Sequence, residues 1–229
     1  MRTGILANSL PAAVRIYNQV KAVPDCECFI LLSPSGKESR LGSLLGHFAR
    51  LALRPERLNS LSLILGGKVL VLDPPLDHPQ TIERLTRLKL DIGLHRTGVI
   101  YRAATINAFR LGILNPHIGL LPEYRGRNVM EWTLLEGNKV GITVFFVDDG
   151  IDTGERIVLR EEVDISHCRS LEEAKEYLFS LDGTFFRRAL ESLRSQGSVS
   201  QINDGSGRRY YVMSKLFRDV VQELIVANK

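Results

Sequence analysis

The chain has 229 residues, of which 44% are hydrophobic and 24% are charged, an ordinary composition for a globular protein with a substantial core. It contains no apolar run long enough to span a membrane, and its first residues turn polar too early for a signal peptide. The formal net charge of +4 is small. We therefore expect a cytoplasmic protein whose partner is an anionic small molecule, with neither a nucleic acid nor a membrane as partner.

The cysteines predict neither a disulfide framework nor a metal site. There are three, Cys26, Cys28 and Cys168, and an odd number in a chain of this length is not typical of a disulfide-stabilised protein. Together with His167 they match none of the usual zinc-binding spacings. We expect reduced, structural thiols and no bound metal.

The N-terminal half alternates strand-like and helix-like segments. Strands are expected over residues 4–8 and 28–32 and from Asp91 onward, and helices over residues 11–20, 44–53 and 81–90. Residues 61–65 and 68–72 flank Gly66-Gly67, which permits either a tight hairpin or two sheet strands. The alternation predicts an α/β fold, a mainly parallel twisted sheet with helices on both faces and Rossmann-like. In such folds ligands bind at the carboxyl ends of the strands.

The C-terminal part has a simpler pattern. A strand is expected over residues 156–163 and one long amphipathic helix over residues 170–193, with Ser170 as its N-cap. A Ser/Gly-rich connection over residues 195–207 precedes a last helix. We expect residues 1–195 to form one domain, and residues 196–229 to form a linker and a helix that packs on this domain or on a second subunit. A homodimer is therefore possible.

The polar residues that could carry chemistry lie in residues 115–126, in residues 141–143 and in residues 149–154. Asn115 and His117 are two apart, so they face the same way on an extended chain. Asp152 lies in a turn after another strand-like run. These three residues could be a turn former, a buried structural histidine and a cap. Alternatively, an amide, an imidazole and a carboxylate at the ends of adjacent elements could stabilise an oxyanion and relay a proton.

These motifs resemble those of the folate-dependent formyltransferases. The family pattern is Asn-x-His, then Leu-Leu-Pro-x-(Tyr/Phe)-(Arg/Lys)-Gly, Gly-x-Thr and Asp-(Thr/Ala)-Gly, and this chain contains it in the same order over about residues 91–163. The family includes enzymes that act on glycinamide ribonucleotide, on methionyl-tRNA and on amino sugars. The resemblance implies a catalytic domain that transfers a formyl group from 10-formyltetrahydrofolate to a primary amine without a metal.

The resemblance also implies a role for each matched residue. Asn115 and His117 are expected to hydrogen-bond the formyl oxygen. Asp152 is expected to favour the charged form of His117 and to take a proton from the attacking amine. Folate contacts are expected from the backbone around Thr97, Val99, Tyr101, Asp148, Asp149, Gly150 and Ile151. Acceptor contacts are expected from Tyr124, Arg125 and Gly126, although Arg125 could instead be an exposed turn residue, and the doublet Arg208-Arg209 is interpreted as solvated surface.

Three features bear on the acceptor. Gly119 stands where the family often has Ser, so a hydroxyl contact near the acceptor is lost or replaced. No glycine-rich loop follows the first strand to hold a ribose phosphate, and the chain ends before it could hold the full C-terminal domain of the methionyl-tRNA enzymes. We expect a nucleotide-linked amino sugar, with glycinamide ribonucleotide as the alternative. A hydrolase that passes the formyl group to water and a non-catalytic folate-binding module remain further alternatives.

Overall fold

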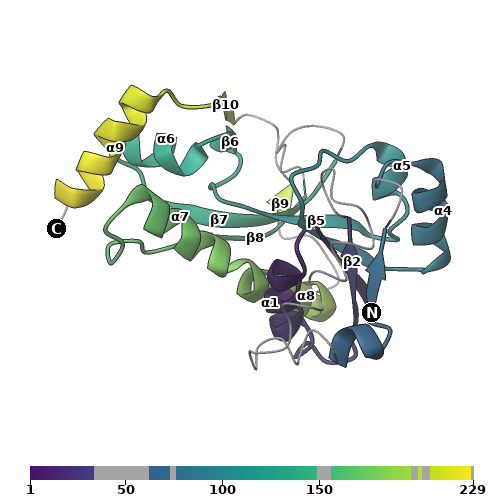
Figure 1. Ribbon diagram of the computed structural model, residues 1–229. Helices are drawn as coiled ribbons and strands as arrows, with labels where there is room; N and C mark the ends of the chain where they lie inside the picture. Colours follow the sequence, from purple (N-terminus) through teal and green to yellow (C-terminus); the bar gives the residue numbers. More distant parts are fainter. Residues whose placement is uncertain (34–61, 73–75, 149–155, 197–200, 203–206, 228–229) are drawn as a thin grey trace. The chain divides into compact units, whose positions relative to one another are not determined.

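A computed structural model describes residues 1–33, 62–72, 76–148, 156–196, 201–202 and 207–227 (Figure 1). The chain divides into two compact units, Met1–Ile113 and Leu114–Lys229. In the part of the chain described, no helix is both long enough and apolar enough to cross a membrane. The predicted helix over residues 44–53 lies outside the described residues.

The first unit is built on parallel strands. β1 (Arg2–Ala7), β2 (Glu27–Leu32), β3 (Val69–Val71) and β4 (Ile92–Arg96) lie in the order β3-β2-β1-β4. The described helices of this unit include α1 (Leu10–Val20), α4 (Pro79–Arg87) and α5 (Ala103–Ile106). The central strands are almost continuously apolar, because strands covered on both faces have no solvent side. The α/β fold class predicted from the alternation is confirmed.

The Gly66-Gly67 pair ends a turn of helix instead of forming a hairpin. Residues 62–65 are helical, and the amides of Gly66 and Lys68 each donate to a carbonyl of that turn at 2.9 Å. Gly67 has a φ of +66°, a conformation that favours glycine after the end of a helix. The prediction of an extended run over residues 61–65 was therefore wrong, whereas the second run does form β3.

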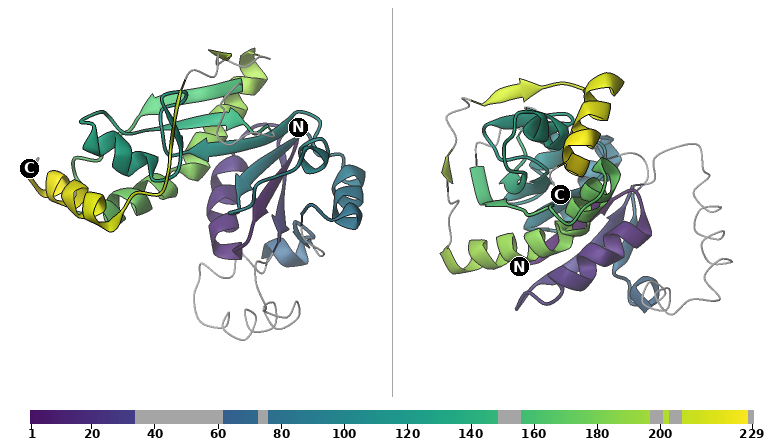
Figure 2. Two further views of the ribbon diagram at one scale, coloured as in Figure 1. Left: turned by 90° about the horizontal axis from the view of Figure 1, so that it is seen from above. Right: turned by 90° about the vertical axis from the view of Figure 1, so that its left-hand side faces the viewer.

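The second unit contains an antiparallel ladder. β5 (Gly112–His117), which enters this unit at Leu114, is followed by β7 (Gly141–Phe146), β8 (Arg156–Glu162) and β9 (Gln201–Ile202) in the order β5-β7-β8-β9. A separate parallel pair joins β6 (Tyr124–Gly126) to β10 (Arg208–Tyr210). Figure 2 shows these strands in teal, green and yellow-green, with helices of the same unit beside them.

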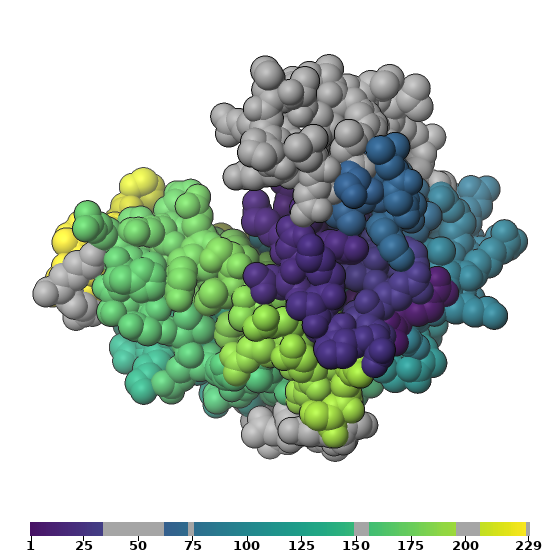
Figure 3. All heavy atoms as spheres, turned by 90° about the horizontal axis from the view of Figure 1, so that it is seen from below, coloured from purple at the N-terminus to yellow at the C-terminus, as the bar shows by residue number. Residues whose placement is uncertain are grey.

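The helices among the described residues of the second unit are α6 (Val129–Leu135), α7 (Leu171–Ser180), α8 (Asp182–Gln196) and α9 (Lys215–Ala227). α8 packs on β7 and β8, and α9 packs on α6 and α7. α7 and α8, drawn in green, are exposed on the face in Figure 3. The prediction of a single helix over residues 170–193 was wrong, because α7 ends at Ser180 and Asp182 begins a new helix. Asp and Gly at positions 182 and 183 are weak helix formers, and an acidic residue suits a first turn.

Candidate functional site

Strand β5 carries two of the three predicted catalytic residues. Asn115 and His117 lie opposite Phe145 and Thr143 of β7, and the alternation of side chains along a strand places both on the same side. Asn115 is half-buried and His117 is buried, with 8% of its surface exposed. β5 therefore presents an amide and an imidazole side by side.

The His117 ring is held by a backbone carbonyl. Its Nε2 lies 2.8 Å from the carbonyl oxygen of Tyr124, and the ring of Phe145 meets it edge-on at 6.4 Å. Because a carbonyl can only accept, Nε2 carries a hydrogen and donates it. This hydrogen bond therefore fixes the orientation of the ring.

A buried hydroxyl fixes the loop after β5. The Oγ1 atom of Thr143 donates to the Gly119 carbonyl at 2.7 Å and accepts from the Leu121 amide at 3.0 Å. A side chain on Gly119 would meet both Nε2 of His117 at 2.7 Å and the Tyr124 carbonyl oxygen at 2.8 Å. The loop can approach the imidazole this closely only because residue 119 has no Cβ.

A guanidinium holds the next part of the same loop. Arg160 on β8 donates from Nε to the Leu121 carbonyl at 2.8 Å, and its NH2 group lies 3.0 Å from both carboxylate oxygens of Glu123. The peptide bond between Leu121 and Pro122 is cis. Two side chains from neighbouring strands, Thr143 and Arg160, thus set the path of the loop from Gly119 to Glu123.

The predicted acceptor residues Tyr124, Arg125 and Gly126 form strand β6. The Tyr124 side chain is buried, and its hydroxyl donates to Glu136 at 2.8 Å and accepts from Asn138 at 2.6 Å. Burial and the hydrogen bond to Glu136 raise the pKa of Tyr124 to about 12. The side chain of Tyr124 is thus part of a packed cluster. The group of Tyr124 that contacts His117 is its backbone carbonyl. Arg125 is half-buried, and Gly126 has a φ of +102° against the Tyr210 carbonyl.

The first unit holds three of the predicted folate-binding residues. The Tyr101 hydroxyl lies 2.8 Å from Nδ1 of His95 and 3.0 Å from the hydroxyl of Thr97, whose oxygen also accepts from the Val99 amide at 3.4 Å. Burial, reinforced by the nearby charge of Arg96, lowers the pKa of His95 to about 4. Val99 is exposed and lies between Thr97 and Tyr101, which are both buried.

The remaining predicted residues lie beyond β7. Asp148 follows that strand and is half-buried. Asp149, Gly150, Ile151 and the predicted catalytic residue Asp152 lie outside the described residues. The structure therefore brings Asn115 and His117 together with the Tyr124 backbone in one unit, and Thr97, Val99 and Tyr101 together in the other.

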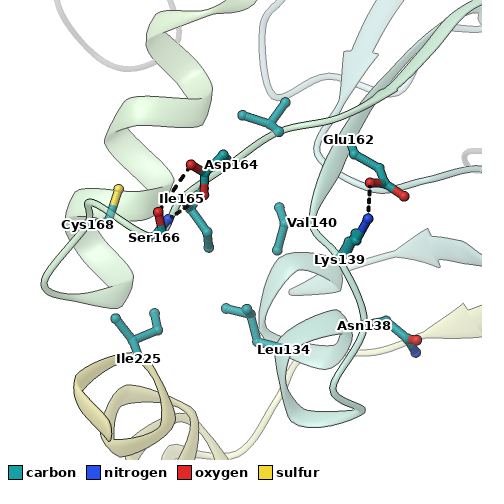
Figure 4. A pocket seen from close by; sticks show the side chains of 11 residues that line it. Leu134, Asn138, Lys139, Val140, Glu162, Asp164, Ile165, Ser166, Cys168 and Ile225 are labelled. Carbon is teal, nitrogen blue, oxygen red and sulfur yellow. Dashed lines mark hydrogen bonds and ion pairs between the residues drawn. The ribbon is translucent and has the colours of Figure 1, made fainter. Parts of the chain in front are cut away.

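A cavity of about 530 Å³ opens in the second unit. Figure 4 shows Leu134, Val140, Ile165 and Ile225 around a common space. At its edge Lys139 pairs with Glu162 at 2.8 Å, and Asp164 accepts from Ser166. None of the predicted site residues lines this cavity, so it plays no part in the predicted chemistry.

The part of the chain described here offers no group of three or more His, Cys, Asp or Glu side chains that could hold a metal ion. Cys26, Cys28 and Cys168 are free thiols. The metal-free reaction stays a prediction.

Comparison with known proteins finds similarity to formyltransferases over the part of the chain that contains this site. The family described as formyl transferase matches residues 97–190, a span that includes Asn115, His117, the loop of Gly119 and Thr143. The methionyl-tRNA formyltransferase of Syntrophus aciditrophicus (strain SB) is 31% identical over 148 residues, which is 63% of this chain and 47% of that protein. Over these residues the chain is similar to formyltransferases. It spans less than half the length of this curated relative.

Solved formyltransferase structures share the fold. A sugar N-formyltransferase from Shewanella sp FDAARGOS_354 superposes with a TM-score of 0.63 at 16% identity, covering 98% of this chain and 87% of that one. The formyltransferase PseJ from Anoxybacillus kamchatkensis, in complex with UDP-4,6-dideoxy-4-formamido-L-AltNAc and tetrahydrofolate, gives a TM-score of 0.53 at 17% identity, with full coverage of both chains. At this level of identity the likeness concerns the fold.

Two residues that shape the site were not among the predicted site residues. Thr143 is part of the Gly-x-Thr motif, so the sequence singled out this position. Its hydrogen bonds to Gly119 and Leu121 could not be predicted, because they depend on the register between β5 and β7. Arg160 belongs to no motif, and only the pairing of β7 with β8 brings it close to the loop from Gly119 to Glu123. No sequence signal could have identified it.

Proposed function

We propose that this chain transfers a formyl group from 10-formyltetrahydrofolate to a primary amine. The observation that carries the proposal is the placement of Asn115 and His117 on one side of β5, with Nε2 of the imidazole fixed by the Tyr124 carbonyl at 2.8 Å. Both residues lie within the span that matches the formyl transferase family. A cytoplasmic location and a homodimeric state are parts of the same proposal.

Each catalytic side chain has a separate task in the proposed reaction. The folate carrier supplies the formyl group. The Asn115 amide donates a hydrogen bond to the formyl oxygen, where negative charge develops as the amine attacks. His117 adds a second, charge-assisted hydrogen bond from Nδ1, since Nε2 is engaged. Asp152 favours the charged imidazole and takes a proton from the amine, directly or through water. The bond between the formyl carbon and the folate nitrogen then breaks, and this nitrogen is protonated as it leaves.

The proposed folate residues of the first unit suit a flat heterocycle. Thr97 and Tyr101 are buried and hydrogen-bonded to each other, which fixes the ends of the segment between them. Val99 and Ile100 are exposed apolar side chains, and a backbone of this kind can offer both amides and carbonyls to a ring with alternating donors and acceptors. Asp148 and the residues that follow it are proposed to supply further contacts.

The proposed acceptor is a nucleotide-linked amino sugar. A structural relative, PseJ, is known with a UDP-linked formamido sugar and tetrahydrofolate, and Arg125 lies next to the Tyr124 carbonyl that holds His117. Residues 7–10, between β1 and α1, contain no glycine, unlike the phosphate-holding loop of the glycinamide ribonucleotide enzymes. Methionyl-tRNA is the second candidate, because the curated relatives are named for it.

Substitution of the three catalytic residues tests the proposal. Asn115→Ala should lower kcat by about 10²- to 10³-fold through the loss of one oxyanion donor, and His117→Ala and Asp152→Ala should be at least as severe. Because the residues act as a unit, the double variants should lose little more than the singles. His167→Ala, which removes an exposed histidine, is the control for folding and activity. Near-normal turnover by His117→Ala on the true acceptor would contradict the mechanism.

A chelator tests the absence of a metal. Dialysis of the full chain against a chelator should leave turnover unchanged. A loss of turnover that zinc restores would contradict this prediction and indicate a zinc site at Cys26, Cys28, His167 and Cys168.

A further inference from the structure

One carboxylate joins the two strands of the β6–β10 pair. Glu136, at the C-terminal end of α6, accepts the Tyr124 hydroxyl of β6 at 2.8 Å and the Tyr210 hydroxyl of β10 at 2.9 Å. The Arg208 guanidinium lies 3.8 Å from the same carboxylate, and Figure 1 shows β6 and β10 beside α6. Because hydrogen bonds to a charged acceptor are about twice as strong as neutral ones, Glu136 holds both tyrosines at the far ends of their rings.

The rings of these two tyrosines are also packed against each other. Tyr124 and Tyr210 are each 7% exposed, and their ring centres are 5.3 Å apart in a stacked arrangement. Trp132 of α6 lies 5.6 Å from Tyr210, and its indole nitrogen donates to the Tyr211 carbonyl at 2.8 Å. Buried rings in such contact have little freedom to move separately. A displacement of the Tyr124 ring would therefore disturb both Tyr210 and Glu136.

The backbone of the C-terminal segment lies against the loop that follows β5. β10 pairs in parallel with β6, with Tyr210 opposite Gly126. A Cβ on Gly126 would overlap the Tyr210 carbonyl, and a Cβ on Gly207 would overlap the Pro122 carbonyl. Glycine at these two positions allows the two backbones to approach this closely. The C-terminal segment thus contacts the loop both before β6 and at the last residue of β6.

Tyr124 connects this cluster to the proposed catalytic histidine. Its carbonyl accepts from Nε2 of His117 at 2.8 Å, and its amide donates to the Leu120 carbonyl at 3.1 Å. Pairing with β10 restrains the backbone of Tyr124, and the hydrogen bond to Glu136 restrains its side chain. The direction of the Tyr124 carbonyl is therefore set from both sides, and with it the hydrogen bond that orients the imidazole.

We infer that Glu136 and Tyr210 are positioning residues for formyl transfer, which act through Tyr124 to hold the His117 ring in the orientation that the reaction requires. The inference rests on the proposed function. A catalytic side chain has to be held within about 0.5 Å of its productive geometry by the packing and hydrogen bonds of residues behind it. Activity then depends on β10, which lies outside the residues 97–190 that match the formyl transferase family.

Substitution of Glu136 tests the inference by steady-state kinetics. Glu136→Ala should lower kcat by about 10- to 100-fold, the cost of a small misplacement of a catalytic group, with much smaller changes in the two substrate KM values. Glu136→Gln keeps an oxygen that accepts from the tyrosine hydroxyls, so it should retain most of the activity. Glu162→Ala is the control, because it removes the same charge from an exposed ion pair with Lys139 and should leave kcat unchanged. A Glu136→Ala variant with wild-type kcat would overturn the inference.

Two neighbouring tyrosines provide a milder test, which keeps the inference falsifiable if Glu136→Ala does not fold. Tyr210→Phe removes one hydroxyl from the Glu136 carboxylate and keeps the stacked ring, so it should lower kcat by about two- to tenfold. Tyr211→Phe removes the same group from the next residue, whose side chain is 67% exposed, and should have no effect. Equal kcat values for these two variants would count against a positioning role.

A nuclear magnetic resonance measurement separates this inference from the proposed function, because it does not require catalysis. In the full chain labelled with ¹⁵N-histidine, the Nε2–H signal of His117 is identified by its loss in His117→Ala. Its hydrogen bond should protect it from exchange with water, and Glu136→Ala and Tyr210→Phe should reduce that protection, whereas the two control variants should not. Unchanged protection in both Glu136→Ala and Tyr210→Phe would refute the positioning role, whether or not the chain transfers formyl groups. Reduced protection in a chain that formylates no amine would support the positioning of the ring and contradict the proposed function.

Discussion

Gly119 determines how closely the loop after β5 approaches the His117 ring. A Cβ at this position would lie within 3 Å of Nε2 and of the Tyr124 carbonyl oxygen, the two atoms of the hydrogen bond that fixes the ring. Insertion of a single carbon into such a contact forces its neighbours apart. This chain has Gly119 where the family often has serine. The absence of a side chain at this position leaves room for the imidazole of His117.

The variant Gly119→Ser tests this fit. It should disrupt the hydrogen bond between Nε2 of His117 and the Tyr124 carbonyl and lower kcat by about 10- to 100-fold, the cost of a small misplacement of a catalytic group. The substrate KM values should change less. Steady-state kinetics together with thermal unfolding would separate this effect from a loss of fold. A serine variant with wild-type kcat would show that the close contact has no influence on the ring.

His95 makes the stability of the first unit depend on pH. Burial and the charge of Arg96 lower its pKa from 6.5 to about 4, so below pH 6.5 the unfolded chain binds a proton that the folded chain rejects. The stabilisation is complete above pH 6.5 and is lost as the pH falls toward 4, by about 3 kcal/mol in total. His95→Asn should lack this part of the pH dependence. Urea unfolding at several pH values measures it, and equal slopes for both proteins would contradict the account.

At this scale the sequence predicted what depends on local geometry. The shared side of Asn115 and His117 follows from the two-residue spacing alone. The partner of His117 could not be predicted, because it is the backbone carbonyl of Tyr124, and every residue has a carbonyl. The inward direction of the Tyr124 side chain depends on Glu136, Asn138 and Tyr210, which are brought near it only by the fold.

At the scale of the elements, the structure contains the predicted N-cap of α7, Ser170. The hydroxyl of Ser170 accepts from the Glu173 amide at 3.1 Å, and the Glu173 carboxylate accepts from the Arg169 amide at 2.6 Å. These contacts satisfy two backbone donors around the helix start, where the first amides lack partners within the helix.

Removal of this cap should be measurable. Ser170→Ala should lower the free energy of unfolding by about 1 kcal/mol. Ser180→Ala is the control, because the Ser180 hydroxyl bonds only to a carbonyl of its own last turn, at 2.6 Å, and its removal should cost little. Chemical denaturation compares the two variants. If Ser180→Ala lowered the free energy of unfolding as much as Ser170→Ala, the N-cap would not contribute specifically to stability.

The strands of the second unit mark the limit of prediction at this scale. β10 was not expected, because a run of Arg208, Arg209 and Tyr210 has no apolar alternation and its partner β6 lies more than 80 residues earlier in the chain. The break between α7 and α8 was missed for a related reason. The apolar periodicity of residues 170–193 continues through Leu181, and the helix break depends on Asp182 and Gly183 rather than on that periodicity.

On the scale of the whole molecule, α9 offers a surface for the proposed homodimer. Its inner face packs on α6 through the buried Val221. Leu216, Val220 and Leu224, spaced four residues apart on another face, are 71%, 43% and 37% exposed. In an antiparallel pair with a second copy these side chains would cover each other, and Arg218 of one helix would approach Glu223 of the other.

The double variant Leu216→Glu with Val220→Glu should therefore shift the protein to a monomer, because it places like charges within the pair. Leu65→Glu, which alters a leucine 79% exposed in the first unit, should leave the assembly unchanged. Light scattering during size-exclusion chromatography measures the mass. A wild-type protein that stays monomeric at every concentration would refute the dimer.

The central claim is that this chain moves a formyl group from folate to an amine. The most direct test incubates the full chain with 10-formyltetrahydrofolate and, in separate reactions, a nucleotide-linked amino sugar, glycinamide ribonucleotide and methionyl-tRNA, and follows the acceptors by mass spectrometry. The account predicts a gain of one formyl group on the amino sugar, with an equal amount of tetrahydrofolate, and none of either with His117→Ala. Release of formate and tetrahydrofolate in the absence of any amine, with no acceptor formylated, would contradict it.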